Sequence, residues 1–446
     1  MAGYGGTAVG EEDLVAIVAV ILVVVIGLVY AYLWKRLAGD TVRSRWARRV
    51  SAVIAVALGL LGPATLIGVR SGHLKWLAWP GYLWLALLFY LLVTLIVLEI
   101  PRLVLRLTWA RHGRTGKRAE APQSRNLAAD RELQPVIAAG ETIDGDTHAP
   151  AAEPGVRNSG PGNTGSGSGA VGEGMDRRLV LARGAAIFAG LTAAGVTGYG
   201  VRTATSAPRI DRVRIPIAKL PRAMDGTRLA VVSDIHLGPL TGIGHAQRIT
   251  RVINSVNADV VCVVGDLVDG TVAELGRLAE PLRGIESRRG AYFVTGNHEY
   301  YSGFEPWIGE VTELGMRPLR NERVEIDGLD LAGVNDLGGD QHGDPADFGK
   351  ALGDRDRSRP VVLMAHQPLA AKDAAPYGVD LQVSGHTHGG QMAPFNLLVT
   401  LQQPVVSGFG RVDGVPVYVT NGAGFWGPPV RVGAPPQVTV VELRMA

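Results

Sequence analysis

The sequence has a single cysteine, Cys262, among its 446 residues. One thiol cannot form an intrachain disulfide, and a structural zinc site built from several thiolates is excluded as well. Cys262 lies in the apolar stretch ADVVCVVGD, where cysteine usually serves as a small buried hydrophobic residue. The thiol therefore does not indicate the compartment in which the protein works.

The chain also has little net charge, +3 in total, but this small sum hides two halves of opposite sign. The first 206 residues hold 21 Lys and Arg against 14 Asp and Glu, whereas residues 207–446 hold 23 against 27. Nucleic acids are bound mainly through clustered Lys and Arg, so the acidic second half argues against such a partner. The length of the chain favours two or three regions.

Charged residues are absent from three apolar runs of about 20 residues, the length that crosses a bilayer as a helix. These runs cover residues 14–34, 50–69 and 77–98. They predict a membrane domain over residues 1–118 with three transmembrane helices. Three buried helices of a soluble core are the alternative, which the basic clusters beside the runs disfavour.

Residues 119–176 are rich in Ala, Pro, Gly and Ser, so we expect a disordered linker there. Arg177 and Arg178 then precede a weakly apolar run at residues 184–201. Paired arginines before such a run are similar to a twin-arginine export signal, here at an internal position. We expect residues 177–206 to form a fourth transmembrane helix; an amphipathic or buried helix is the alternative.

Basic residues near the ends of membrane helices stay on the cytoplasmic side. Residues 35–49 and residues 101–118 each hold six Lys and Arg, whereas the loop between the second and third runs has only Arg70 and Lys75. This pattern predicts a multi-pass protein of the cell membrane with its N-terminus outside. The domain at residues 207–446 is then also outside if the fourth run crosses, and in the cytoplasm if it does not.

Residues 207–446 alternate short β-rich runs with helical patterns, notably at residues 245–257 and 306–314. Alternation of this kind predicts a layered α/β domain. Open α/β sheets place their sites at the carboxyl ends of strands, and polar motifs follow most of these runs. The expected strands are residues 228–232, 260–264, 291–295, 329–333, 360–364, 417–420 and 437–443.

Five of the polar motifs are rich in metal-binding residue types. They are D-I-H at 234–236, G-D-L-V-D at 265–269, G-N-H-E at 296–299, His366, and G-H-T-H at 385–388. Taken singly, each is explained by a turn, a helix cap or a solvated loop. Gathered at one sheet edge without a metal, so many polar groups would be costly to desolvate. As ligands of two divalent cations they fit Mn, Fe or Zn, which accept mixed imidazole and carboxylate sets.

In this order, the five motifs resemble those of the calcineurin-like metallophosphoesterases over roughly residues 209–443, without a substitution. GNHEYY, GHTHGGQ and NGAGFWGPPVRVGAPP are similar to the bacterial membrane-associated branch of that family. The resemblance implies a four-layer α/β/β/α sandwich and two metal ions, with a carboxylate bridging them. It assigns one ion to Asp234, His236, Asp266 and His388, and the second to Asp266, Asn297, His366 and His386.

The resemblance also implies roles for residues beside the ligands. His298 is similar to the catalytic histidine of the family, which protonates the leaving oxygen or stabilises its charge; a residue that only positions Asn297 is the alternative. Asp269 and Glu299 are expected to orient ligands. Phe425, Trp426 and Arg431 are candidates for the lining of the substrate cleft, although Phe425 and Trp426 would equally serve to close the core.

The predicted function is that of a membrane-anchored phosphoesterase, in which a hydroxide bridges two metals about 3.5–4 Å apart and attacks phosphorus. The substrate is a phosphate, phosphodiester or pyrophosphate ester, and membrane attachment favours a lipid- or envelope-linked one. The resemblance includes hydrolases of UDP-diacylglucosamine. The alternatives are a metal-binding sensor or scaffold without turnover, and a metal-dependent nuclease on the same fold.

Overall fold

The structure, a computed structural model, describes residues 11–116 and 169–446. The chain forms two compact units. The first consists of the residues up to Leu95 together with Gly184–Ala446, and the second consists of Ile96–Arg183. Most of the predicted linker lies outside the described residues. Its predicted end was wrong, because helix α4 already begins at Gly169. The segment from Gly169 to Arg178 contains three glycines, which weaken a helix, but no proline, which would break one.

Four helices contain the long apolar runs. Each includes a stretch that is long and apolar enough to cross a membrane, and the four candidate spans lie where the sequence predicted them. Large apolar side chains on the first helix point outward, and Leu22 and Val23 are 57% and 71% exposed. Such surfaces are ordinary in lipid and rare in water. The helices are α1 (Glu11–Trp34), α2 (Arg45–Arg70), α3 (Ala78–Gly116) and α4.

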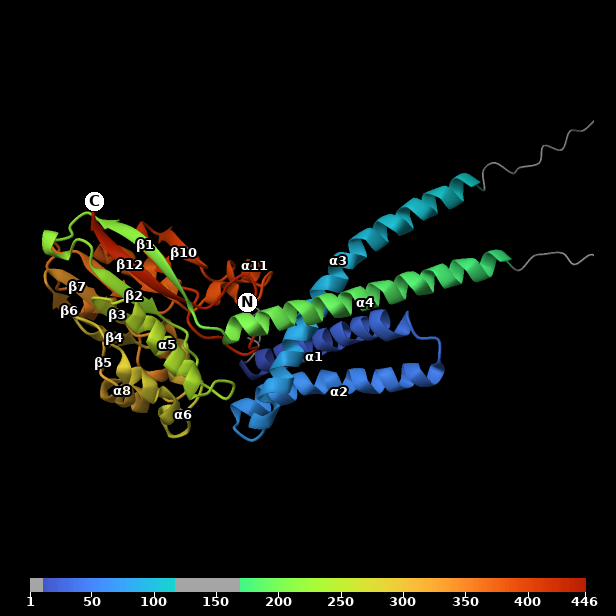
Figure 1. The fold of residues 1–446 in the computed structure, drawn as a ribbon, viewed down its shortest axis with the longest axis horizontal. Coiled ribbons are helices and arrows are strands. Elements are labelled where there is room, and N and C mark those ends of the chain that lie inside the picture. Colours follow the sequence, from blue (N-terminus) through green and yellow to red (C-terminus); the bar gives the residue numbers. More distant parts are fainter. Residues whose placement is uncertain (1–10, 117–168) are drawn as a thin grey trace, which may run out of the picture. The chain divides into compact units, whose positions relative to one another are not determined.

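Residues 207–446 form two six-stranded sheets (Figure 1). Strands β2 to β5 run parallel within the first sheet, and β7, β8, β9 and β11 run parallel within the second. The first sheet has the order β1 (Arg209–Ile217), β12 (Gln437–Met445), β2 (Arg228–Val232), β3 (Val260–Val264), β4 (Ala291–Val294), β5 (Met316–Pro318). The second has the order β10 (Gly408–Val412), β11 (Val415–Val419), β9 (Leu381–Ser384), β8 (Val361–Met364), β7 (Leu329–Gly333), β6 (Glu322–Ile326).

Three hydrophobic cores separate four layers. In β2, Ala230 and Val232 face a core shared with helices, whereas Leu229 and Val231 face the core between the two sheets. Successive side chains of a strand point to opposite faces, so a strand without charge needs cover on both. The helices are α5 (Ile243–Ser255), α6 (Val272–Ala279) and α8 (Phe304–Glu313) on one side, and α9 (Phe348–Leu352) and α10 (Ala371–Ala374) over the third core. This is the predicted α/β/β/α sandwich.

Candidate metal centre

Loops that follow five strands, β2, β3, β4, β8 and β9, meet at one edge of the two sheets. The carboxyl ends of neighbouring parallel strands share an edge, so side chains in the following loops are brought together. Five of the seven residues predicted to bind metal lie in these loops, Asn297 is the first residue of the short helix α7 (Asn297–Tyr301), and His388 begins a short 3-10 helix (His388–Gly390). Their polar atoms approach one another across the two sheets. The seven are Asp234, His236, Asp266, Asn297, His366, His386 and His388.

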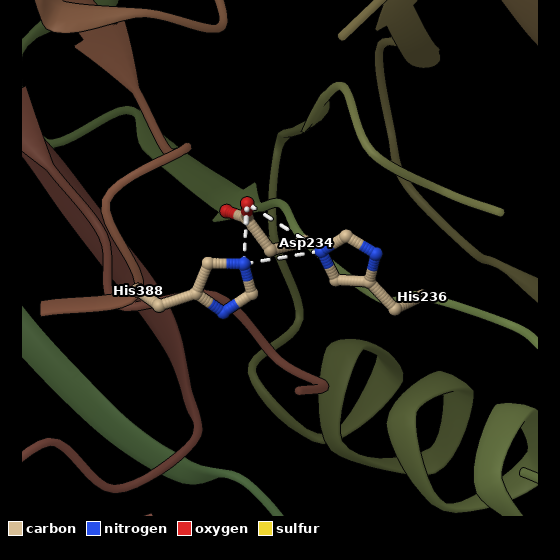
Figure 2. A group of neighbouring side chains, drawn as sticks. All are labelled: Asp234, His236 and His388. Carbon is tan, nitrogen blue, oxygen red and sulfur yellow. Dashed lines mark hydrogen bonds and ion pairs between the residues drawn. The ribbon is translucent and has the colours of Figure 1, made fainter. Parts of the chain in front are cut away.

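The first group consists of three buried side chains, Asp234, His236 and His388 (Figure 2). His236 Nε2 lies 3.1 Å from His388 Nε2, and Asp234 Oδ1 lies 3.3 Å from the same His388 nitrogen. Asp234 Oδ1 is 3.9 Å from His236 Nε2. Two imidazole nitrogens and a carboxylate oxygen therefore face a common point, which is the arrangement of ligands around a cation.

The second group consists of Asp266, His366 and His386, with Asn297 beside them. His366 Nε2 lies 3.2 Å from Asp266 Oδ2, and His386 Nδ1 lies 3.3 Å from His366 Nε2 and 3.1 Å from Asn297 Oδ1. The Asp266 oxygen is also 3.8 Å from His236 Nε2, a member of the first group. Asp266 therefore stands between the two groups, where a bridging ligand would have to lie.

The pKa values of these residues are shifted in both directions. Burial lowers the pKa of His386 to about 3 and that of His388 well below its usual value, so both rings are neutral and offer a lone pair. Asp266 is buried too, but His366 and His298 outweigh that effect and hold its pKa well below the usual range. His366 and Asp234 shift the other way. Burial lowers the pKa of His366, but the carboxylates of Asp266 and Asp234 outweigh it and raise that pKa well above its usual value, and burial raises the pKa of Asp234. Imidazoles and carboxylates are the ligand types that Mn, Fe and Zn accept, so the residues present fit divalent metal ions.

Backbone strain is concentrated in the same loops. Five of the seven residues have φ between 49° and 70°, a left-handed conformation that is uncommon outside glycine: Asp234, His236, Asp266, His386 and His388. Glycines allow the loops to approach each other. A Cβ atom at Gly296 would collide with the Asp266 carboxylate, and one at Gly385 would collide with Ser233 and Asp234. Strain of this kind persists at sites where function requires it.

His298 lies beside both groups and is held by Asp269. Its Nδ1 is 2.7 Å from Asp269 Oδ1, and the same oxygen lies 2.8 Å from Nδ1 of His236. Burial lowers the pKa of His298, but the carboxylates of Asp266 and Asp269 outweigh it and raise the pKa to about 9. The ligand atoms of His298, His236 and Asp266 also lie close enough together to hold a metal ion. His298 Nε2 is 4.0 Å from Asp266 Oδ2. Asp269 thus links a predicted ligand to the predicted catalytic histidine.

Glu299 holds the backbone of Asp266 in place. Its buried carboxylate accepts hydrogen bonds from the backbone N–H groups of Asp266, Leu267 and Gly296, at 2.9, 2.7 and 2.6 Å. Burial and the nearby charge of Asp266 raise the pKa of Glu299 to about 7. The side chain ties the loop after β3 to the loop after β4, so it fixes two of the five loops relative to each other.

Arg431 was predicted to line the substrate cleft, and that prediction was wrong. The side chain is fully buried and donates to the carbonyl oxygens of Gly424, Asn421, His388 and Ala434, and to Nδ1 of His388 at 3.0 Å. Arginine presents five donors, and here they satisfy carbonyls of the 421–434 loop. Its motif alone does not distinguish this role from phosphate binding.

A cavity of about 550 Å³ opens over the ligand groups. His298 and Trp426 both line it, with ring centroids 5.9 Å apart, and Trp426 is 57% exposed. Sequence reasoning missed the rest of its apolar lining, which comes from Leu85 and Phe89 of α3 and from Met392, Phe395, Val399 and Pro428. A signal for it existed, because no Asp, Glu, Lys or Arg occurs between Asp380 and Arg411.

A four-layer sandwich with two imidazole–carboxylate groups at one sheet edge defines a class of metal-dependent α/β proteins. Sequence comparison identifies the family within this class. The family model of the calcineurin-like phosphoesterases matches residues 227–390. An uncharacterized metallophosphoesterase of Aquifex aeolicus is 33% identical over 243 residues, which cover 53% of this chain and 92% of that protein. The chain therefore belongs to the calcineurin-like metallophosphoesterase family, whose members use divalent metals.

Two further relatives match this chain over only part of their length. The "Transmembrane protein with metallophosphoesterase domain" of Danio rerio is 38% identical over 291 residues, covering 62% of this chain and 65% of that protein. An uncharacterized metallophosphoesterase of Helicobacter pylori is 37% identical over 239 residues, covering 53% of this chain and 64% of that protein. The chain thus spans just under two thirds of the length of these relatives. The name of the first and the four candidate spans support membrane association.

Proposed function

We propose that this protein is a membrane-anchored hydrolase of phosphoesters that works with two divalent metal ions. The observation that carries the proposal is the convergence of seven ligand-type side chains in two groups that share Asp266. Membership of the metallophosphoesterase family supports the phosphoester as the substrate class. When bound, the two ions would supply the positive charge that polarises the phosphoryl group and activates water.

The residues of the chain have distinct roles in this proposal. Asp234, His236 and His388 hold one ion, and Asn297, His366 and His386 hold the other, with Asp266 between them. Asp269 fixes the imidazoles of His236 and His298 through one oxygen atom. Glu299 fixes the backbone that carries Asp266. Arg431 holds the backbone of His388 through its carbonyl oxygen.

His298 is placed to act on the leaving group. Asp269 accepts a hydrogen bond from Nδ1, which leaves Nε2 as the ring atom that can transfer a proton. The carboxylates of Asp266 and Asp269 also favour the protonated form of the ring, since they raise the pKa of His298. His298 lines the cavity beside Asp266 and Asn297, and a phosphoester seated over the metals would place its leaving oxygen there.

Hydrolysis of an aryl phosphodiester by the purified full-length protein tests the proposal. We expect turnover with added Mn²⁺, loss of turnover with EDTA, and recovery when Mn²⁺ is restored. Binding of two ions without turnover would favour a sensor or scaffold instead. Cleavage of DNA in preference to the small diester would favour the nuclease, which the acidic balance of residues 207–446 disfavours.

A lipid-linked substrate is supported by the cavity lining. Leu85 and Phe89 belong to the candidate span Lys75–Val104, yet they line the same cavity as His298. A ligand that reaches from the ligand groups to these side chains has a phosphate at one end and an apolar group at the other. A UDP-diacylglucosamine-type ester has this character, and removal of its acyl chains should raise KM more than it lowers kcat.

An extracytoplasmic catalytic domain is supported by contacts of the loop between α2 and α3. Lys75 Nζ lies 2.7 Å from Glu274 Oε1, and the Arg70 guanidinium lies 5.4 Å from the ring centre of Tyr301. This loop is poor in basic residues and was predicted outside, so its contacts favour the same side for the domain. Protease added to spheroplasts should digest residues 207–446. Protection until lysis would place the domain in the cytoplasm.

A further inference from the structure

The segment that follows the G-H-T-H motif has an apolar tip, residues 394–401, that includes the short helix α11 (Asn396–Val399). Four of its large side chains face outward: Phe395, Leu397, Leu398 and Leu401 are 47%, 67%, 56% and 80% exposed. No other segment within residues 207–446, all of which the structure describes, exposes four such residues so close together. Contiguous exposed apolar surface marks a binding surface on a soluble domain.

The base of the apolar tip is fixed on both sides. On one side, the Ala393 N–H donates to the Val432 carbonyl at 3.0 Å. On the other, Gln403 Oε1 accepts from the Leu369 N–H at 3.2 Å. Between these anchors, Phe395 and Val399 line the cavity over the ligand groups. The exposed leucines are therefore held in place beside the candidate metal centre, in a segment with specific contacts at both ends.

The apolar tip also stands next to the end of a candidate membrane span. Met392, just before the tip, forms a β-bridge with Val432. The neighbouring Arg431 N–H donates to the carbonyl of Gly200 in α4 at 2.9 Å. Gly200 precedes Thr205, the last residue of the candidate span Arg177–Thr205, by five residues, or about 7.5 Å along a helix. The base of the tip is thus connected to α4 between one and two turns before the end of that span.

We propose that the apolar tip inserts into the interfacial layer of the lipid bilayer, so that the cavity over the metal centre opens at the membrane surface. The segment has no charge to oppose insertion, and phenylalanine with leucine is the composition of interfacial anchors. The adjoining span holds the tip at this surface, so lipid is the apolar phase it meets first. The inference rests on the membrane attachment proposed above and is independent of catalysis.

Reporter cysteines, introduced one at a time into the full-length chain, test the inference. Leu398→Cys or Leu401→Cys reports on the tip, Leu22→Cys reports on the exposed side of α1, and Glu286→Cys reports on an exposed polar position. Cys262 does not interfere, because it is fully buried and burial raises its pKa to about 12. Each protein is labelled with an environment-sensitive fluorophore and reconstituted into phosphatidylcholine–phosphatidylglycerol vesicles that contain lipids spin-labelled at a shallow or a deep position.

Insertion about 5–10 Å deep, as in interfacial helices, should shift the emission of both tip labels to the blue and let the shallow quencher reduce it most. The label at Leu22 should be quenched by the deep quencher, and the label at Glu286 by neither. Quenching at Leu22 without quenching at the tip would overturn the inference and leave the proposed function standing. A blue shift at the tip without lipid quenching would indicate cover by protein, such as a second copy, and would also overturn it. No quenching at Leu22 would overturn the membrane attachment and the inference together.

Discussion

Strand β3 and helix α1 contain the same kinds of apolar residue, but the strand buries these side chains and the helix exposes them. All five residues of Val260–Val264 are fully buried, whereas Val23 and Leu28 of α1 are 71% and 64% exposed. The strand is short enough for a sheet on one face and helices on the other to cover it. The helix is as long as a bilayer is thick, and lipid replaces the protein cover.

The apolar tip combines features of both regions. It is short, as a strand is, but it exposes its leucines as α1 does, and it belongs to a domain that otherwise buries its apolar runs. The exception lies beside the cavity over the ligand groups. The domain at residues 207–446 therefore departs from its own packing pattern beside the candidate metal centre, where contact with lipid would serve the membrane-linked substrate proposed above.

The largest effect is expected from a substitution in the domain that contains β3, at the buried residue Asp266. Asp266→Ala removes the carboxylate that stands between both ligand groups, so elemental analysis should find that the two ions are lost and turnover should fall to background. Asp354→Ala is the control, because its side chain is 82% exposed and pairs only with Arg323. Retention of two ions by the Asp266 variant would contradict the bridging role.

The seven predicted ligand residues lie together at one sheet edge, whereas the predicted strands agree with the structure only in part. Ligand motifs were recognisable because their residue types follow uncharged strands, and β2, β3 and β7 have the predicted bounds. Strands β1 and β6 were missed because charged side chains interrupt them, as in R-I-D-R-V-R and E-R-V-E-I. β9 was missed because its buried Gln382 and Ser384 make it polar. The role of Arg431 depends on carbonyl positions that no motif encodes.

Arg431→Leu should have the next largest effect. The substitution takes the donor away from four buried carbonyl oxygens, at roughly 1–3 kcal/mol for each group left unsatisfied. We expect a fall in the Tm of the full-length protein and weaker metal binding, since the His388 carbonyl loses the hydrogen bond that holds this part of the site in place. Arg411→Leu, at an exposed position, should change stability by only about 0.5 kcal/mol or less. Equal Tm values for the two variants would contradict the structural role.

His298→Ala should lower turnover by roughly 10²-fold, the scale of a lost general acid, while metal content stays near normal. The loss should be greatest for a phosphoester with a poor leaving group, because a good one departs without a proton. Comparing kcat for two such esters measures this directly. Equal turnover of the variant and the natural protein on the poor leaving group would end the catalytic assignment, and loss of an ion would make His298 a ligand.

Replacing Leu397 and Leu398 together by Asp should affect one substrate and spare another. Turnover of a phosphoester embedded in vesicles should fall roughly tenfold or more, because moving one leucine from lipid to water costs about 1.5–3 kcal/mol. Turnover of a soluble aryl phosphodiester should not change, since neither residue lines the cavity. Ile243→Asp, at another exposed apolar position, is the control and should alter neither rate. Equal losses on both substrates would mean that the tip acts on the site and not on the lipid.

The smallest effect is expected from the ion pair between Lys75 and Glu274. Both side chains are about half exposed, at 50% and 43%, so water screens the attraction and two long side chains lose freedom to form it. Glu274 also accepts from Thr271 at the start of α6, so Glu274→Ala alone would mix a lost helix cap with a lost ion pair. A double-mutant cycle with Lys75→Ala removes the cap from the comparison, and Tm measurements on the full-length protein should give a coupling of about 1 kcal/mol or less.

A coupling of roughly 3 kcal/mol would show instead that the pair is shielded from water, as happens for buried ion pairs. The loop between α2 and α3 would then be a packed part of the catalytic domain, and the boundary between the lipid-facing and water-facing regions would have to move.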